Sequence, residues 1–184
     1  MSDEFLGERR RVLEDSFFAE RDRGLMEKLK KQVKRDELAN ACGIQNPAVL
    51  ESLVNANISP ETITALTLVP LIAVAWADGS IAPEERDAIR SATESAGIEA
   101  GSICQQLLDV WLAKPPGPEL VEAWKGYIQA FSSSASPAAV ETLRDDVLGH
   151  ASGIAAAAGG VLGIGSISKR EKAVIDDLAS AFSS

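Results

Sequence analysis

The fold is decided by the stretch AVAWADGSIAPEER, residues 73–86. An apolar helical run ends here at Asp78-Gly79, and an isoleucine follows in a short loop. Pro83 then opens an acidic segment that suits the first turn of a helix. Glycine suits the position after a helix because it adopts positive φ without strain. The stretch therefore predicts a helix–loop–helix unit.

A second copy of this pattern lies 86 residues further along the chain. Residues 79–89 (GSIAPEERDAI) align with residues 165–175 (GSISKREKAVI), and Gly, Ser, Ile, Glu and Ile coincide at fixed positions. We expect two related helix–loop–helix units, joined around the proline-rich turn at residues 115–118, that form a pseudo-twofold helical bundle. Asp78 of the first copy corresponds to Ile164 in the second, so any charge chemistry at the first loop is missing from the second.

The composition favours close-packed helices over β-structure. Hydrophobic residues make up 46% of the 184 residues but aromatic residues only 5%, whereas a β-sandwich needs more Val, Tyr, Phe and Thr. Proline at the first helical position, after a capping residue, marks most of the helix starts. We expect an all-α protein with helices at residues 3–20, 22–42, 47–55, 60–77, 83–96, 102–113, 118–131, 137–158 and 169–182.

The first 57 residues are predicted to form a charged helical segment, followed by a helical domain at residues 58–184. Ten of the 18 Lys and Arg residues lie within the first 35 positions. Apolar residues spaced mostly three and four apart form a narrow stripe at Leu13, Phe17, Leu25, Met26, Leu29 and Val33. We expect a helical hairpin that packs on the main body or on a partner chain, so that these helices could join a homo-oligomer or a protein partner. A solvated helical arm with one docking face is the alternative.

Charge and hydropathy restrict the partners and the compartment. With a formal net charge of −9, the chain is a poor candidate for nucleic-acid binding, which depends on Lys and Arg neutralising phosphates. No apolar run reaches the length of a membrane span, and the sequence starts with charged residues rather than an apolar leader. Cys42 and Cys104 show no metal-ligand spacing. We therefore expect a cytoplasmic protein without nucleic-acid partners.

Asp78 is the residue on which any ligand chemistry of the loop depends. It lies at the negative end of the preceding helix dipole, where a carboxylate is disfavoured by about 0.3–1 kcal/mol unless something compensates. In the structural interpretation, Asp78 and Glu85 accept backbone N–H groups and Gly79 supplies a positive φ. In the other interpretation, Asp78, Glu85 and a loop carbonyl hold a divalent cation, with Glu84 as a further candidate ligand.

The loop differs from an ordinary calcium loop. Aligned with an EF-hand, it would place Val74 and Trp76 at the first two ligand positions, and neither side chain can coordinate a metal. The residues interpreted as building the two turns are Gly79 and Ile81 in the first copy and Gly165, Ile167 and Glu171 in the second.

Catalytic patterns are sparse in this sequence. His150 is the one histidine, which excludes a zinc site built on histidine pairs, and no G-x-S-x-G pattern accompanies it. A metal-assisted hydrolase centred on Asp78 and Glu85 would lack an accompanying base or nucleophile. We expect a protein that is not an enzyme, with this hydrolase as a further alternative.

The segment from Leu68 to Ile89, with its A-W-A-D-G-x-I motif and acidic helix start, resembles the TerB-like family. That family is named for bacterial tellurite-resistance proteins. The resemblance covers about residues 58–182 and implies an all-helical fold of two similar halves. It also implies a role in stress response or tellurite resistance through protein or divalent-cation binding. The alternative is a protein–protein interaction module whose Asp-Gly loop is structural.

Overall fold

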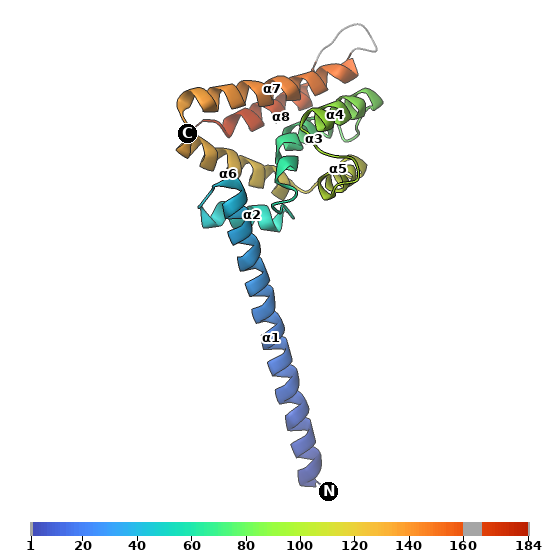
Figure 1. Cartoon of the computed structure of the whole chain (residues 1–184). Coiled ribbons are helices and arrows are strands. Elements are labelled where there is room, and N and C mark those ends of the chain that lie inside the picture. The colour runs from blue at the N-terminus through green and yellow to red at the C-terminus, as the bar shows by residue number, and fades with distance from the viewer. Residues whose placement is uncertain (1, 160–166, 184) are drawn as a thin grey trace.

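The computed structural model describes residues 2–159 and 167–183, with side chains at residue 20, residues 22–157 and residues 167–183. This part of the chain folds into helices without strands, as predicted (Figure 1). None of its helices combines the length and apolar character needed to cross a membrane. The elements are α1 (Ser2–Cys42), α2 (Pro47–Asn55), the 3₁₀-helix η1 (Ile63–Leu68), α3 (Val69–Ala75), α4 (Pro83–Ser95), α5 (Ile103–Ala113), α6 (Pro118–Ser134), α7 (Pro137–Gly159) and α8 (Lys169–Ser180).

Local capping bonds explain several helix starts. The side chain of Asn46 accepts hydrogen bonds from the backbone N–H groups of Ala48 (3.0 Å) and Val49 (3.4 Å). The Ser102 hydroxyl accepts one from the N–H of Gln105 (3.1 Å). Such bonds satisfy backbone donors that a helix leaves free in its first turn. The helix starts predicted at residues 47, 83, 118, 137 and 169 are confirmed.

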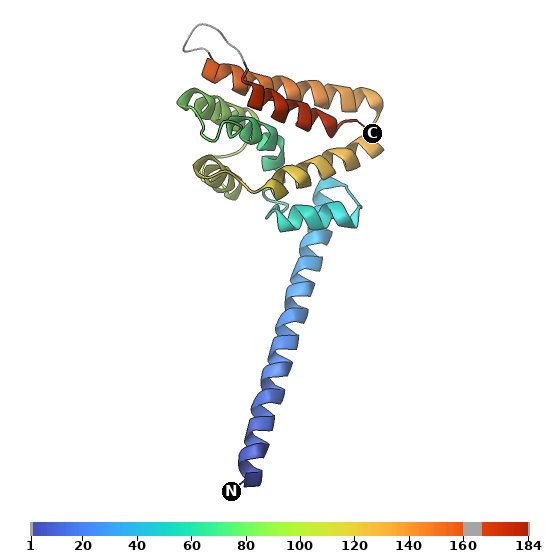
Figure 2. The ribbon, with the colours of Figure 1, turned by 180° about the vertical axis from the view of Figure 1, so that it is seen from behind.

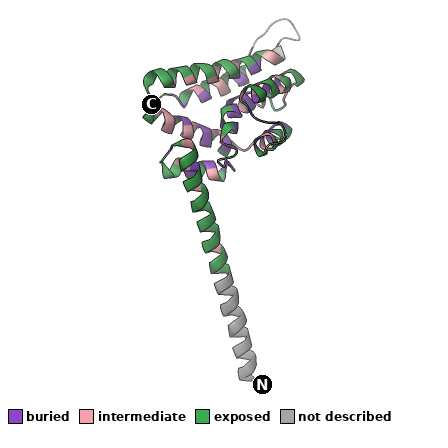
Figure 3. Cartoon of the chain, viewed as in Figure 1, coloured by how far each residue is buried: buried purple, intermediate pink, exposed green. Residues whose placement is uncertain are grey.

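Helix α3 lies at the centre of the core. Its residues are buried apart from Ala73, and α7 packs against both α3 and α4. Helix α8 packs against α3 and α7, so the helices of the two predicted repeats form one body. Figure 3 shows the buried residues gathered in these helices, whereas the described part of α1 is exposed along most of its length.

The prediction of an N-terminal helical hairpin is wrong. Residues 2–42 form the single helix α1, which projects away from the other helices (Figures 1 and 2). Gly24 lies near the expected turn and costs about 1 kcal/mol relative to alanine, but one glycine does not end a helix. The Leu, Met, Glu and Lys residues around it are strong helix formers, so the helix continues through this point.

The single helix predicted at residues 60–77 is also wrong. The 3₁₀-helix η1 precedes α3, and a turn in which the N–H of Thr62 donates to the carbonyl of Ser59 (3.0 Å) precedes η1. Pro70 has no N–H to donate to the carbonyl of Leu66, so a regular α-helical ladder cannot pass this point. The chain uses the tighter 3₁₀ geometry before the proline instead.

The C-terminal end of α1 joins the body. Leu38 is fully buried there, and α2 packs against both α1 and α6. Leu50 and Leu53 of α2 belong to the same core cluster as α3. The packing therefore holds the C-terminal end of α1, which we call its root, against α2. The domain division predicted after residue 57 stays a prediction.

Candidate functional site

The loop between α3 and α4 is fixed at both ends. Beyond the end of α3, the N–H of Gly79 donates to the carbonyl of Trp76 (2.9 Å), and Gly79 has a φ of +89°, which residues with a side chain rarely adopt. The Nε1–H of Trp76 donates to the carbonyl of Trp111 in α5 (2.8 Å). Ile81 packs against the core at the other end of the loop.

Glu85 and Glu171, which correspond in the repeat, occupy equivalent positions in α4 and α8. Each carboxylate accepts a hydrogen bond from the backbone N–H of the residue before its helix, Ala82 (2.7 Å) or Ser168 (2.6 Å). The hydroxyl of Ser168 accepts the N–H of Glu171 in return (3.2 Å), which completes a capping box. Ala82 has no side-chain acceptor, so α4 has only the glutamate half. Both glutamates are buried, with 4% and 6% of their surface exposed.

Asp78 lies beside these two carboxylates. Asp78, Glu85 and Glu171 line one cavity of about 200 Å³. A guanidinium nitrogen of Arg170, at the start of α8, lies 3.8 Å from a carboxylate oxygen of Asp78. Arg170 therefore supplies a compensating positive charge for Asp78 at the end of its helix. Because both side chains are largely exposed, this ion pair contributes only about 0–1 kcal/mol.

The predicted metal ligands are only partly brought together. Glu84 is exposed and does not line the cavity, whereas Glu171 from the second repeat does. Within residues 2–159 and 167–183, no group of three or more His, Cys, Asp or Glu side chains is placed to hold a metal ion. A cation at Asp78 and Glu85 stays a prediction. Of the second turn, Ile167 is 37% exposed and Gly165 lies outside the described residues.

The electrostatics of the cavity oppose ionisation of Glu85. Burial raises the pKa of this carboxyl group above its ordinary value of 4.5, and the charges of Glu171, Asp78 and Glu84 raise it further. The hydrogen bond from Ala82 acts in the opposite direction but does not reverse the shift. A charged Glu85 therefore costs stability in the folded protein at neutral pH.

Replacing Glu85 with glutamine is expected to raise the melting temperature at pH 7. The amide oxygen still accepts the Ala82 N–H, and the repulsive charge is removed. A gain of about 1 kcal/mol corresponds to about 2–4 °C for a domain of this size. Because the folded-state pKa of Glu85 is raised, protonation stabilises the wild type as the pH falls through that pKa. The difference between the two proteins should therefore close towards pH 4.5 and below.

Melting curves of the wild type and Glu85→Gln, followed by circular dichroism from pH 7 to pH 4, measure this difference. Glu84→Gln is the matched control, since it removes an exposed carboxylate one residue away and should change the melting temperature much less. A difference for Glu85→Gln that stays constant with pH would contradict the raised pKa.

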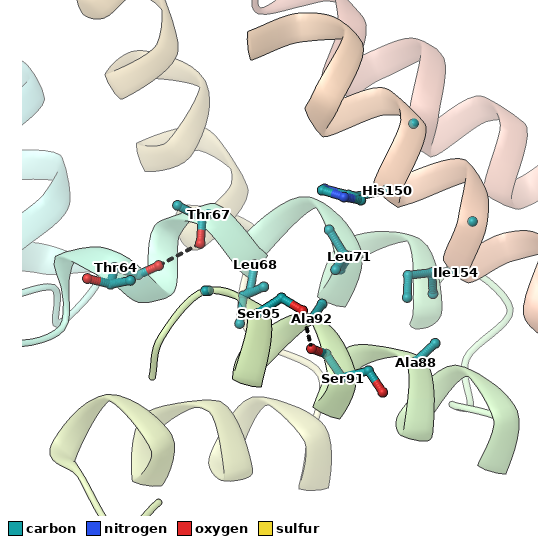
Figure 4. Close-up of a pocket in the computed structure, with 13 residues that line it drawn as sticks. Thr64, Thr67, Leu68, Leu71, Ala88, Ser91, Ala92, Ser95, His150 and Ile154 are labelled. Carbon is teal, nitrogen blue, oxygen red and sulfur yellow. Dashed lines mark hydrogen bonds between the residues drawn. The ribbon is translucent and has the colours of Figure 1, made fainter. Parts of the chain in front are cut away.

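An apolar groove of about 620 Å³ lies elsewhere, between η1, α3, α4 and α7. Figure 4 shows its walls, with Leu68 and Leu71 on one side, Ala88 and Ala92 of α4 on another, and His150 of α7. Small residues on facing helices leave this space, because α4 contributes only Ala and Ser to the groove and α7 adds two glycines. This volume is within the range of small-molecule sites.

Two of the hydroxyl groups that line the groove are engaged with backbone carbonyls. The hydroxyl of Thr67 donates to the carbonyl of Thr64 (2.8 Å), and that of Ser95 donates to the carbonyl of Ser91 (2.9 Å), as the dashed lines in Figure 4 mark. His150 is the titratable side chain among the described residues that line the groove, and it is exposed. The groove therefore offers apolar contact rather than an acid–base pair.

The described part of α1 presents a stripe of exposed apolar side chains. Leu25, Met26, Leu29 and Val33 are between 52% and 56% exposed, and their spacing places them along one side of the helix. Ile103 and Val110 on α5 form a smaller exposed apolar pair. We name the first group the α1 stripe. The α1 stripe exposes a larger continuous apolar area than the single apolar residues found on ordinary protein surfaces.

Comparisons with known proteins add no relative to these observations. No protein-family model matches the chain, and neither a characterised protein nor a solved structure matches it. The fold and the candidate sites are therefore interpreted from the chain itself.

Sequence reasoning missed two neighbours of Asp78. Glu171 was interpreted only as a residue of the second turn, although its correspondence with Glu85 in the repeat was a usable signal: equivalent positions in a pseudo-twofold bundle can meet near the axis. Arg170 is 92 positions from Asp78 and carried no local signal. The apolar groove was missed as well, although small residues recur on one side of the helix at residues 83–95.

Proposed function

We propose that this chain is a non-enzymatic, TerB-like helical protein that works by binding another protein through α1. The observation that carries the proposal is the α1 stripe, on a helix that projects from the folded body. Burying an apolar side chain of this size contributes about 1.5–3 kcal/mol when burial is complete. Four such side chains on one helix face are typical of a helix that packs against a partner helix.

The body of the protein supports this role as an anchor. Leu38 is buried at the root of α1, so the stripe begins only a few residues from the core. The proposed binding surface is therefore attached to a folded unit through a continuous helix. The TerB-like resemblance implies that this binding serves stress response or tellurite resistance. That biological role stays a prediction.

Replacing Met26 and Leu29 with serine tests the proposal. We expect this variant to lose protein partners, or self-association, by about 10- to 100-fold, since each lost apolar contact is worth about 1 kcal/mol when half buried. Its melting temperature should stay close to that of the wild type, because both side chains are exposed in the free protein. Affinity capture of the tagged protein from its own cells, together with analytical ultracentrifugation, measures both outcomes.

Ile103→Ser with Val110→Ser is the matched control, because it removes two exposed apolar side chains from a different helix. The control should retain the partners and the oligomeric state of the wild type. If the α1 variant retains them equally well, the stripe is not a binding surface and the proposal fails.

Divalent-cation binding at Asp78 is a second candidate function, because Asp78 lines one cavity with Glu85 and Glu171. An ion there would need water or backbone oxygens as further ligands, since no three acidic side chains among the described residues are placed to hold one. Melting curves with calcium, magnesium, manganese or zinc, for the wild type and Asp78→Asn, decide this point. A stabilisation by one of these ions that disappears in Asp78→Asn would support a cation site. Equal curves with and without the ions would leave the Asp78–Arg170 pair as the role of this aspartate.

A further inference from the structure

A basic cleft lies at the root of α1, beside the α1 stripe. It has a volume of about 510 Å³ and is bounded by α1 and α2. Helix α1 contributes three cations to its wall, Lys28, Lys31 and Arg35, and α2 contributes the carboxylate of Glu51. The excess of positive charge contrasts with the chain as a whole, whose formal net charge is −9.

The three cations share one side of α1. At about 100° per residue, Lys28, Lys31 and Arg35 fall within an arc of about 60°. Within the described part of the chain, neither Lys28 nor Lys31 forms an ion pair. Their positive charges are therefore available to a partner, rather than used to hold α1 against α2.

Arg35 is held mainly by a neighbour on its own helix. One guanidinium nitrogen lies 3.8 Å from the carboxylate of Glu51, and another donates to the side-chain oxygen of Gln32 (2.6 Å). Its Nε atom is buried and has no hydrogen-bond partner among the described residues. A guanidinium can bind a carboxylate through two parallel hydrogen bonds, whereas the contact with Glu51 is an ion pair too long for a hydrogen bond.

Apolar side chains accompany the charges. Leu29 lines the cleft and also belongs to the α1 stripe, and Val54 of α2 lines the opposite wall. The cationic side and the apolar stripe are thus adjacent on the same helix. A partner that lies along the stripe would bring one of its edges over Lys28 and Lys31.

From this arrangement we infer that the cleft between α1 and α2 binds an acidic amphipathic helix of a partner protein. The apolar side of that helix packs on the stripe, and its Asp or Glu side chains meet Lys28, Lys31 and Arg35. This inference rests on the proposed function and specifies the chemistry of the partner. The apolar walls favour a peptide over a nucleic-acid backbone, whose phosphates would leave Leu29 and Val54 without contacts.

Binding of designed helical peptides to the full chain tests the inference. Two fluorescent peptides of about 20 residues are designed as helices with leucines along the same face. The positions beside the leucines are Glu in one peptide and Lys in the other. Fluorescence anisotropy should show that the Glu-flanked peptide binds at least about tenfold more tightly, with an affinity that falls as salt is added. Lys28→Gln with Lys31→Gln should weaken this binding by about tenfold.

Lys30→Gln with Lys34→Gln is the matched control, because it removes the same charge from exposed positions of α1 that do not line the cleft. It should change the affinity by less than about threefold. Equal effects of the two double variants, equal binding of the two peptides, or no binding of either would overturn the inference. Tighter binding of a duplex DNA of similar length, or self-association that Lys28→Gln with Lys31→Gln abolishes, would also overturn it.

These outcomes separate the inference from the proposed function. If the Glu-flanked and Lys-flanked peptides bind equally and Met26→Ser with Leu29→Ser weakens both, the stripe is a binding surface without acidic selectivity. If neither peptide binds while the cellular partners still depend on Met26 and Leu29, the proposed function stands and the acidic-helix inference fails.

Discussion

Replacing Trp124 with alanine is expected to lower the free energy of unfolding by about 3–5 kcal/mol. Trp124 lies on α6 and is 2% exposed. It is the largest of the fully buried side chains among the described residues. Its ring meets the ring of Phe182 edge-on, with a centroid distance of 6.1 Å and an interplanar angle of 71°. Truncation loses this aromatic contact and leaves a cavity that the surrounding helices fill only partly.

A polar contact between α6 and α8 lies next to Trp124, and it makes the substitution easier to interpret. Lys125 forms an ion pair with Asp177 of α8 (2.7 Å) and another with Glu122 on its own helix (3.2 Å). The ion pairs of Lys125 remain in Trp124→Ala. The measured loss of unfolding free energy should therefore come from the lost aromatic packing rather than from detachment of α8. Urea titrations followed by circular dichroism give the free energy, and the melting temperature should fall by about 6–20 °C.

Trp124→Phe is the conservative control. It keeps an aromatic ring opposite Phe182 and should lose clearly less stability than Trp124→Ala. A loss below 1 kcal/mol for the alanine variant would mean that Trp124 is not buried against Phe182 as the structure shows.

The sequence predicted those features of the fold that depend on short-range contacts. Asn46 caps α2 with bonds that span two and three residues, and Ser168 and Glu171 cap α8 across three. Such signals are complete within one turn of chain, so the helix starts follow from them. A glycine after a helix is an equally local signal, and Gly79, beyond the end of α3, has the positive φ that the sequence predicts (+89°).

The errors arose where the deciding interaction was absent or distant. Nothing near residue 21 forces a turn, so the choice between a hairpin and one long helix depends on whether the two halves of α1 would pack together. The arrangement in η1 and α3 follows from the missing N–H of Pro70, which the predicted helix overlooked. For the candidate site, Asp78 acquires its neighbour Arg170 only through the packing of α8 near the loop.

The basic cleft illustrates the same limit. Lys28, Lys31 and Arg35 were visible as part of a basic N-terminal segment, but their grouping requires α2 as the second wall. A hairpin would have covered part of α1, so the stripe and the cleft form a joint surface because α1 is a single helix. The composition predicted a charged helical segment at the N-terminus, and the tertiary fold places three of its cations beside α2.

The two isoleucines that the repeat equates are expected to respond differently to the same substitution. Ile89→Ala should cost about 2–5 kcal/mol, because Ile89 is completely buried in α4. Ile175, its counterpart 86 residues later in α8, is only partly buried against the core. Its replacement by alanine should cost about 1 kcal/mol, since part of the lost apolar surface already faces water.

Urea titrations of both variants measure this asymmetry directly, and each variant serves as the control for the other because the chemical change is identical. The sequence alignment alone predicts equal costs for the two positions, whereas the structure predicts a difference of at least about 1 kcal/mol. Equal losses would favour a symmetric bundle and contradict the observed packing of α4 and α8. A larger loss for Ile89 would show that the repeat preserves the turn and its glutamate cap while the two halves have diverged in their share of the core.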